Sequence, residues 1–180
     1  MKSVRKLAAA ALTGAAYAAL TILTAPISYG AVQMRISEVL CVLPFFIPCT
    51  GWGLFAGCII SNLFSAAGLL DVIFGPLATL LAALCMSMLG RRGRLSMTAA
   101  ALACAMPVVF NGVIVGGVLA KALADLRAWP LFGLQVAAGE AVVLYAAGLP
   151  LLRLMLRTPV FRRLAEQING APLVDKPPET

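Results

Sequence analysis

Long uncharged stretches, separated by charges, prolines and glycines, dominate the pattern of this chain. Their lengths are typical of membrane-spanning α-helices, which need about 20 apolar residues each. The uncharged stretch 39–70 exceeds one span, and Pro44, Pro48 and Gly51 near its middle signal a turn. We therefore divide it into two short helices. The predicted helices cover residues 7–25, 36–47, 51–66, 71–89, 95–123 and 129–152, with a loop at 26–35 and a proline kink at Pro107.

The composition changes this picture only by excluding other classes of protein. Of 180 residues, 62% are apolar and 12% are charged, whereas soluble domains are about half apolar and a quarter charged. We therefore predict an all-α membrane protein with six transmembrane helices. Residues 1–157 would form the membrane domain, and residues 158–180 a basic cytoplasmic segment with a flexible tail. The uncharged run 7–34 is too long for the apolar core of a signal peptide, so we expect the first helix to be retained.

The basic residues predict the orientation. Six helices place both termini on one side, and ten of the 14 Lys and Arg residues then share that side. Cytoplasmic loops are enriched in Lys and Arg, so we expect both termini in the cytoplasm and a multi-pass protein of the cell membrane. The ten residues are Lys2, Arg5, Lys6, Arg91, Arg92, Arg94, Arg153, Arg157, Arg162 and Arg163.

Several kinds of chemistry find no support in the sequence. The chain has no histidine, no GxxxxGK[ST] phosphate-binding loop, no GxSxG and no HExxH motif. An enzyme is therefore the least favoured class, and we expect no metal or cofactor on this chain. The five cysteines lie in apolar stretches without a CxxC pair, and we interpret them as buried small hydrophobic residues. No internal repeat is visible, so an inverted-repeat carrier is not supported.

Polar side chains inside predicted helices are the candidate functional residues, because such groups are costly in a membrane. Most fall in the outer half of the helices, where converging polar groups over an apolar floor form a pocket for a small polar molecule. Glu140 is the hardest to explain otherwise, since no basic residue lies near it in the sequence. The candidate substrate-binding residues are Gln33, Arg35, Glu38, Asn62, Asp71, Phe110, Asn111, Trp129 and Glu140.

Most of these candidates also have a purely structural alternative. Amides can join neighbouring helices, and opposite charges three residues apart can pair on one helix. The alternatives are helix-to-helix hydrogen bonds for Asn62 and Asn111, a mutual ion pair for Arg35 and Glu38, a helix N-cap for Asp71, and an interfacial position for Trp129.

The first predicted helix is rich in alanine and glycine. Ala11, Ala15 and Ala19 recur at every fourth position, a spacing that lets another helix backbone approach closely. Two interpretations stay open, which are packing within the bundle and a flat face for a separate membrane partner.

Several sequence blocks carry a family resemblance. They are APISYGAVQMRISE at 25–38, LPFF at 43–46, GCIISNL at 57–63, LDVIFGPLATL at 70–80, PVVFNG at 107–112, and GE at 139–140 before LP at 149–150. The first block is the most specific. They resemble the QueT family, the substrate-binding S components of energy-coupling factor (ECF) transporters, and the resemblance extends over about 7–152.

The resemblance implies a six-helix bundle that binds its substrate from outside. It also implies a membrane scaffold subunit and two cytoplasmic ATPases as partners, so that ATP is used by those subunits. The spacing of Ala11, Ala15 and Ala19 is similar to the alanine motif by which S components dock on the scaffold. The implied substrate is a queuosine precursor, either queuine or an aminomethyl- or cyano-deazaguanine.

The candidate residues are chemically compatible with a deazaguanine. Glu140 can accept the ring N–H and the exocyclic amine together, and Asn111 can read the neighbouring carbonyl or ring edge. An aminomethyl cation would favour a second carboxylate, either Asp71 or Glu38. Trp129, Phe132 or Phe110 would cover the ring, and Gln33 and Arg35 would close the pocket.

Two other interpretations remain. The chain would be the same type of subunit with another planar heterocycle or an aromatic amino acid as cargo. Alternatively, it would be an oligomeric membrane scaffold or channel without a saturable ligand.

Overall fold

The fold is all-helical throughout the residues that the structure, a computed structural model, describes: 2–29, 33–65, 67–91, 96–123 and 125–173. This agrees with the predicted all-α class. In chain order the elements are α1 (Lys2–Leu23), α2 (Ala25–Ser28), the 3₁₀-helix η1 (Ile36–Phe45), α3 (Thr50–Asn62), α4 (Leu69–Arg91), α5 (Met97–Ala122), the 3₁₀ turn η2 (Leu126–Ala128), α6 (Trp129–Val143), the π-helical turn η3 (Leu144–Gly148), α7 (Leu149–Arg157) and α8 (Pro159–Asn169).

Four stretches within these described ranges are long and apolar enough to cross a membrane. They are Ser3–Leu23, Leu69–Arg91, Met97–Ala122 and the continuous helix Leu126–Arg157. The two remaining predicted spans correspond to η1 and α3, which are shorter. At a rise of about 2.0 Å per residue in a 3₁₀-helix and about 1.5 Å in an α-helix, each covers about 20 Å of a hydrocarbon layer about 30 Å thick.

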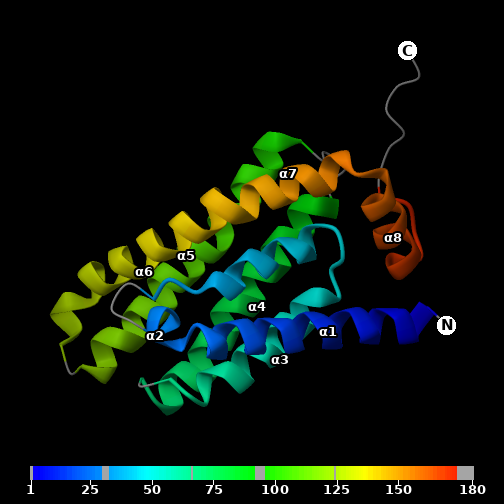
Figure 1. Ribbon diagram of the computed structural model, residues 1–180. Helices are drawn as coiled ribbons and strands as arrows, with labels where there is room; N and C mark the ends of the chain where they lie inside the picture. The colour runs from blue at the N-terminus through cyan, green and yellow to red at the C-terminus, as the bar shows by residue number, and fades with distance from the viewer. Residues whose placement is uncertain (1, 30–32, 66, 92–95, 124, 174–180) are drawn as a thin grey trace.

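The helices run side by side, and the two ends of the bundle differ (Figure 1). The N-terminus, the turn between η1 and α3, and α8 lie at one end, whereas α2 and the connection from α5 to α6 lie at the other. Lys6 and Arg91 line a common groove at the N-terminal end, where Asn169 of α8 donates to the Phe46 carbonyl at 2.7 Å. Arg92 and Arg94 of the predicted basic loop, and residues 174–180 of the predicted tail, lie outside the described residues.

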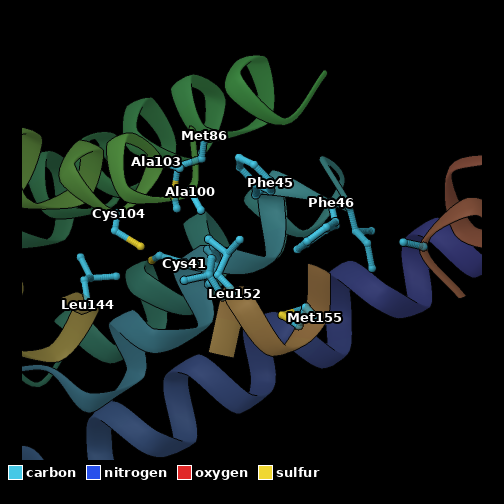
Figure 2. Packing of buried hydrophobic residues seen from close by; sticks show 14 of the residues in the cluster. Cys41, Phe45, Phe46, Met86, Ala100, Ala103, Cys104, Leu144, Leu152 and Met155 are labelled. Carbon is cyan, nitrogen blue, oxygen red and sulfur yellow. The ribbon is translucent and has the colours of Figure 1, made fainter. Parts of the chain in front are cut away.

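The hydrophobic core packs η1 against α4, α5, α7 and α8. Figure 2 shows Phe45 and Phe46, after Cys41 of η1, among side chains of the surrounding helices. Phe46 is fully buried and makes edge-to-face contacts with Phe45 at 5.2 Å and with Phe161 of α8 at 5.3 Å. Helix α8 contacts the bundle through its apolar face, where Ala165 and Ile168 are also buried. Burying a large apolar side chain such as Phe46 stabilises the fold by about 1.5–3 kcal/mol.

The small residues of α1 lie on two faces with different surroundings. Ala10 and Gly14 face Gly53 and Gly57 of α3 so closely that a Cβ on any of these glycines would meet the opposing backbone. This close approach requires glycine and matches the small-residue packing of membrane helices. The other row, Ala11, Ala15 and Ala19, is exposed on the surface of the bundle.

Several predicted boundaries differ from the structure: α1 begins at Lys2 and not at residue 7, and α3 ends at Asn62 and not at residue 66. Part of the predicted loop 26–35 is the short helix α2, whose first turn accommodates Pro26, since a proline there lacks only an N–H that would be unpaired anyway. The sixth helix continues past 152 to Arg157. The π-helical turn η3 ends at Gly148, two residues before Pro150, and changes the hydrogen-bonding register just before that proline removes a backbone donor.

Candidate functional site: a buried polar cluster

Polar side chains from six elements and the segment before η1 meet inside the bundle. Each is at most 3% exposed, so the surrounding helices exclude water from them. We call this group the polar cluster; its members are Tyr17, Gln33, Arg35, Glu38, Cys41, Cys58, Asn62, Asp71, Thr79, Asn111 and Glu140.

Glu38 lies at the contact of α1 and η1, and both of its carboxylate oxygens accept hydrogen bonds. The Tyr17 hydroxyl of α1 donates to Oε1, and the Cys41 thiol donates to Oε2 at 2.8 Å. The 3₁₀ geometry of η1 explains the second bond, because residues three apart eclipse each other in such a helix. Both donors are uncharged groups, so neither forms an ion pair with Glu38.

Arg35 pairs with Asp71 rather than bonding Glu38. Its Nη2 lies 3.4 Å from Asp71 Oδ2 and donates to Gln33 Oε1 at 3.1 Å. The guanidinium also lies 5.7 Å from the centre of the Tyr29 ring, within cation–π range. Gln33 adopts a positive φ of 47°, uncommon for a residue other than glycine. This group joins the segment before η1 to the first turn of α4.

Asp71 also receives support from α3. Asn62 Nδ2 donates to the backbone carbonyl of Asp71 at 2.8 Å, and Gly75, one turn further along α4, leaves room for both side chains. Helix α4 begins at Leu69, two residues before Asp71, so Asp71 is an acidic residue of the first turn instead of the N-cap.

Glu140 of α6 and Asn111 of α5 form a second half of the cluster. Asn111 Nδ2 donates to Glu140 Oε1 at 3.0 Å, which is the helix-to-helix bond named as an alternative for Asn111. Helices α5 and α6, which carry this pair, both pack against η1, which carries Glu38.

Five buried polar side-chain atoms have no hydrogen-bond partner within the described ranges, and all but that of Gln135 belong to the polar cluster. Buried polar groups are nearly always paired in native proteins, and each exception needs an explanation such as an absent ligand. The atoms are Arg35 Nε, Asn62 Oδ1, Asp71 Oδ1, Gln135 Oε1 and Glu140 Oε2.

The two predicted aromatic residues lie away from the hydrogen bonds of the cluster. Trp129 is 46% exposed, and its indole N–H donates to the Val113 carbonyl at 2.9 Å. It lines an apolar groove of about 550 Å³ between α5 and α6. Phe110 is partly buried and packs against a small apolar cluster of Ala78, Val115 and Val136. Their roles in covering a ligand stay predictions.

Four members of the cluster are not among the site residues predicted from the sequence: Tyr17, Cys41, Cys58 and Thr79. Cys58 lies 3.9 Å from the Tyr17 hydroxyl and 3.6 Å from the Thr79 hydroxyl, so it is buried but in polar surroundings. One signal was available for Tyr17. Thr13, Tyr17 and Thr21 recur every fourth residue in an otherwise apolar helix, and all three are buried, a pattern that indicates a polar stripe facing inward.

Comparison with known proteins bears on what this site serves. Residues 7–157 match the profile of the family described as QueT transporter. The chain belongs to the QueT transporter family. This membership confirms the resemblance of the sequence blocks, covers the whole polar cluster, and identifies a membrane transport protein, not an enzyme. No curated protein and no solved structure matches the chain.

Proposed function

We propose that the chain is the substrate-binding S component of an ECF-type importer in the cell membrane. It captures a queuosine precursor, queuine or a deazaguanine, from outside and delivers it inward together with a membrane scaffold subunit and two cytoplasmic ATPases. The chain itself binds no cofactor, and ATP is used by the partners. Family membership supports the transport role, and a polar cluster enclosed by apolar helices suits a small polar ligand.

In this proposal six helices cross the membrane, with η1 and α3 as a short pair, and both termini lie in the cytoplasm. The basic residues at the N-terminal end of the bundle support this orientation. The opposite end, where Arg35 and Asp71 lie, then faces outward. Short helices often mark the binding site of a transporter, and η1 supplies Glu38 to the cluster.

The observation that carries the proposal is the free oxygen of Glu140. This carboxylate is 2% exposed, yet Oε2 has no hydrogen-bond partner among the residues described. Burial of such a group is costly unless it is paired. The ring N–H and exocyclic amine of a deazaguanine would supply the donors, while Asn111 would hold the carboxylate in place and contact the ring edge.

Docking on the scaffold is assigned to the exposed face of α1. Ala10 and Gly14 are already packed against α3, whereas Ala11, Ala15 and Ala19 are exposed. A second helix can therefore approach α1 closely along this row. Because the charged members of the cluster are at most 3% exposed, the cycle includes an opening of the elements around the cluster, on the outside for capture and on the inside for release.

Ligand binding to the purified chain in detergent tests the proposal. Queuine and the two deazaguanines are titrated against wild type, Glu140→Gln, and the control Glu166→Gln on α8, by tryptophan fluorescence or calorimetry. We expect saturable one-site binding that weakens roughly tenfold to a hundredfold in Glu140→Gln and is unchanged in the control. Binding that survives Glu140→Gln would exclude the role of Glu140, and a folded sample that binds none of the three would refute the substrate class.

A second experiment tests the partner assignment. The wild-type chain is co-expressed with the scaffold and ATPase subunits and recovered through a tag, in parallel with Ala15→Phe. We expect the ATPases to co-purify with wild type only, because a bulky side chain on an exposed face blocks helix approach without disturbing the fold. Equal recovery with both chains would remove the alanine face from the interface.

A further inference from the structure

The groove at the N-terminal end of the bundle has no part in the proposed capture of a substrate. It has a volume of about 560 Å³, and its walls come from α1, α3, α4, the end of η1 and the residues that follow α8. None of the described residues that line it belongs to the polar cluster. Gly90 of α4 lies so close to the Phe45 carbonyl that a Cβ would not fit, and this contact holds α4 against the end of η1.

Two basic side chains line this groove from different helices. Lys6 comes from α1 and Arg91 from the last turn of α4, and both are exposed. The ion pair found in the described part of the chain joins Arg35 to Asp71, so no carboxylate described there neutralises Lys6 or Arg91. The described lining of the groove includes neither Asp nor Glu. The groove therefore presents two positive charges to an anion.

An apolar face continues from Arg91 along α4. Met88, Leu84 and Leu81 follow Arg91 at intervals of three, four and three residues, which places them on one face of the helix. The three side chains are 58%, 42% and 41% exposed. The ten residues from Arg91 to Leu81 rise about 15 Å, which is half of a hydrocarbon layer about 30 Å thick. This face therefore has the length of one membrane leaflet.

Trp52 of α3 indicates the depth of the groove in the membrane. It is 61% exposed and lines the groove beside Met88. Its ring makes an edge-to-face contact with Phe55 at 6.3 Å, so its position on α3 is defined by packing. Tryptophan is enriched where the hydrocarbon layer meets the headgroups. The basic end of the groove then lies at the level of the lipid headgroups.

We propose that this groove binds one anionic phospholipid of the cytoplasmic leaflet. Its phosphate lies between Lys6 and Arg91, and an acyl chain follows Met88, Leu84 and Leu81. Basic pockets on the cytoplasmic side of membrane helices suit anionic headgroups. A free phosphate ion would use the two cations but leave the apolar face uncovered, so the lipid is the better match. By contacting both basic residues, the headgroup joins the end of α1 to the end of α4.

Quenching of Trp52 fluorescence by brominated lipids tests the proposal. The chain has two tryptophans, so Trp129→Phe leaves Trp52 as the single reporter. This protein is placed in phosphatidylcholine vesicles that contain a small fraction of brominated phosphatidylglycerol or, in parallel, of brominated phosphatidylcholine. One basic residue near the surface favours an anionic lipid by about fivefold. We therefore expect phosphatidylglycerol to be preferred at Trp52 by about fivefold to twentyfold.

Two double variants on this background locate the preference. Lys6→Gln with Arg91→Gln removes both charges of the groove, and the preference should fall close to one. The matched control is Arg157→Gln with Arg163→Gln, which removes the same charge from exposed positions outside the groove and should retain the preference. Equal quenching by the two lipids in the parent protein overturns the proposal. So does a preference that survives the first double variant, or one that both double variants lose equally.

Native mass spectrometry of the wild-type chain makes the test independent of any variant. The chain is released from mixed micelles that contain equal amounts of phosphatidylglycerol and phosphatidylcholine. We expect one retained phosphatidylglycerol, and equal retention of the two lipids, or of neither, overturns the proposal. The deazaguanine titrations measure the substrate site separately, so failure of the lipid site and failure of the proposed function are distinguishable.

Discussion

Replacing Tyr17 by phenylalanine isolates the contribution of one hydroxyl to the polar cluster. Tyr17 is fully buried and its hydroxyl donates to Oε1 of Glu38. Phenylalanine retains the ring and its packing against the core, so the cavity left is that of one oxygen atom. What changes is that a buried carboxylate oxygen loses its donor, while Cys41 continues to donate to Oε2.

The expected loss of stability in Tyr17→Phe depends on the group that accepts the hydrogen bond, which is the carboxyl of Glu38. Hydrogen bonds between membrane helices contribute about 0.6 kcal/mol on average, whereas hydrogen bonds to charged groups contribute about 1.5–3 kcal/mol. Both partners here are 0% exposed, so water cannot replace the lost donor. We therefore expect Tyr17→Phe to lower the free energy of unfolding by about 1.5–3 kcal/mol.

The assay is reversible unfolding of the purified chain in mixed micelles with increasing denaturing detergent, followed by circular dichroism. Tyr145→Phe is the matched control, because its hydroxyl donates to the Ala101 carbonyl at 3.0 Å on the exposed surface. The control should cost about 0.6 kcal/mol or less. If Tyr17→Phe costs no more than Tyr145→Phe, then the hydrogen bond from Tyr17 to Glu38 does not stabilise the polar cluster.

Three further predictions concern the packing around the site. Gly53→Ala places a methyl group against the Ala10 backbone. In the same unfolding assay, overpacking should lower the free energy of unfolding by about 1–3 kcal/mol, and the higher helix propensity of alanine should offset about 1 kcal/mol of this loss. An increase in stability would contradict the close α1–α3 contact. Gly75→Ala directs a methyl group at Asn62 and Asp71 but keeps every polar group of the cluster. It should weaken ligand affinity by roughly tenfold. An unchanged affinity in calorimetric titrations would refute this prediction. Phe161→Ala removes the edge-to-face contact with Phe46 and should lower the free energy of unfolding by about 3 kcal/mol. The unfolding assay and faster proteolysis of α8 would detect this loss. A protease-resistant α8 in the variant would show that other contacts hold it.

The parts of the fold that the sequence predicts well are those set by composition and length. Uncharged runs bounded by charges indicated the long helices to within a few residues, as for α4 at Leu69–Arg91 and α5 at Met97–Ala122. The type of helix in 36–47 was not predictable, because apolar content does not distinguish 3₁₀ from α hydrogen bonding. The continuation of the last span to Arg157 depends on the π-helical turn before Pro150, which has no sequence signal of its own.

The sequence predicted which residues belong to the candidate site better than it predicted which of them pair with one another. Glu140, Asn111, Asn62, Asp71, Glu38, Arg35 and Gln33 were identified by the cost of polar groups in a membrane, and the structure brings them together. Their partners depend on helix rotation and tertiary contacts, so Arg35 pairs across the bundle with Asp71 although Glu38 is nearer in sequence. Trp129 illustrates the same limit, since its bond to Val113 turns it toward the α5–α6 groove.

The shortness of η1 and α3 has a consequence for how the chain enters the membrane during synthesis. Each covers about 20 Å, and η1 carries Glu38, so neither element would partition alone from the translocon into lipid. The two must insert as a hairpin, and the groups that receive it are already in place on α1. Tyr17 offers a donor for Glu38, and Gly14 offers a close contact for Gly57. Because α1 precedes η1 and α3 in the chain, it can act as a template on which these two short helices assemble.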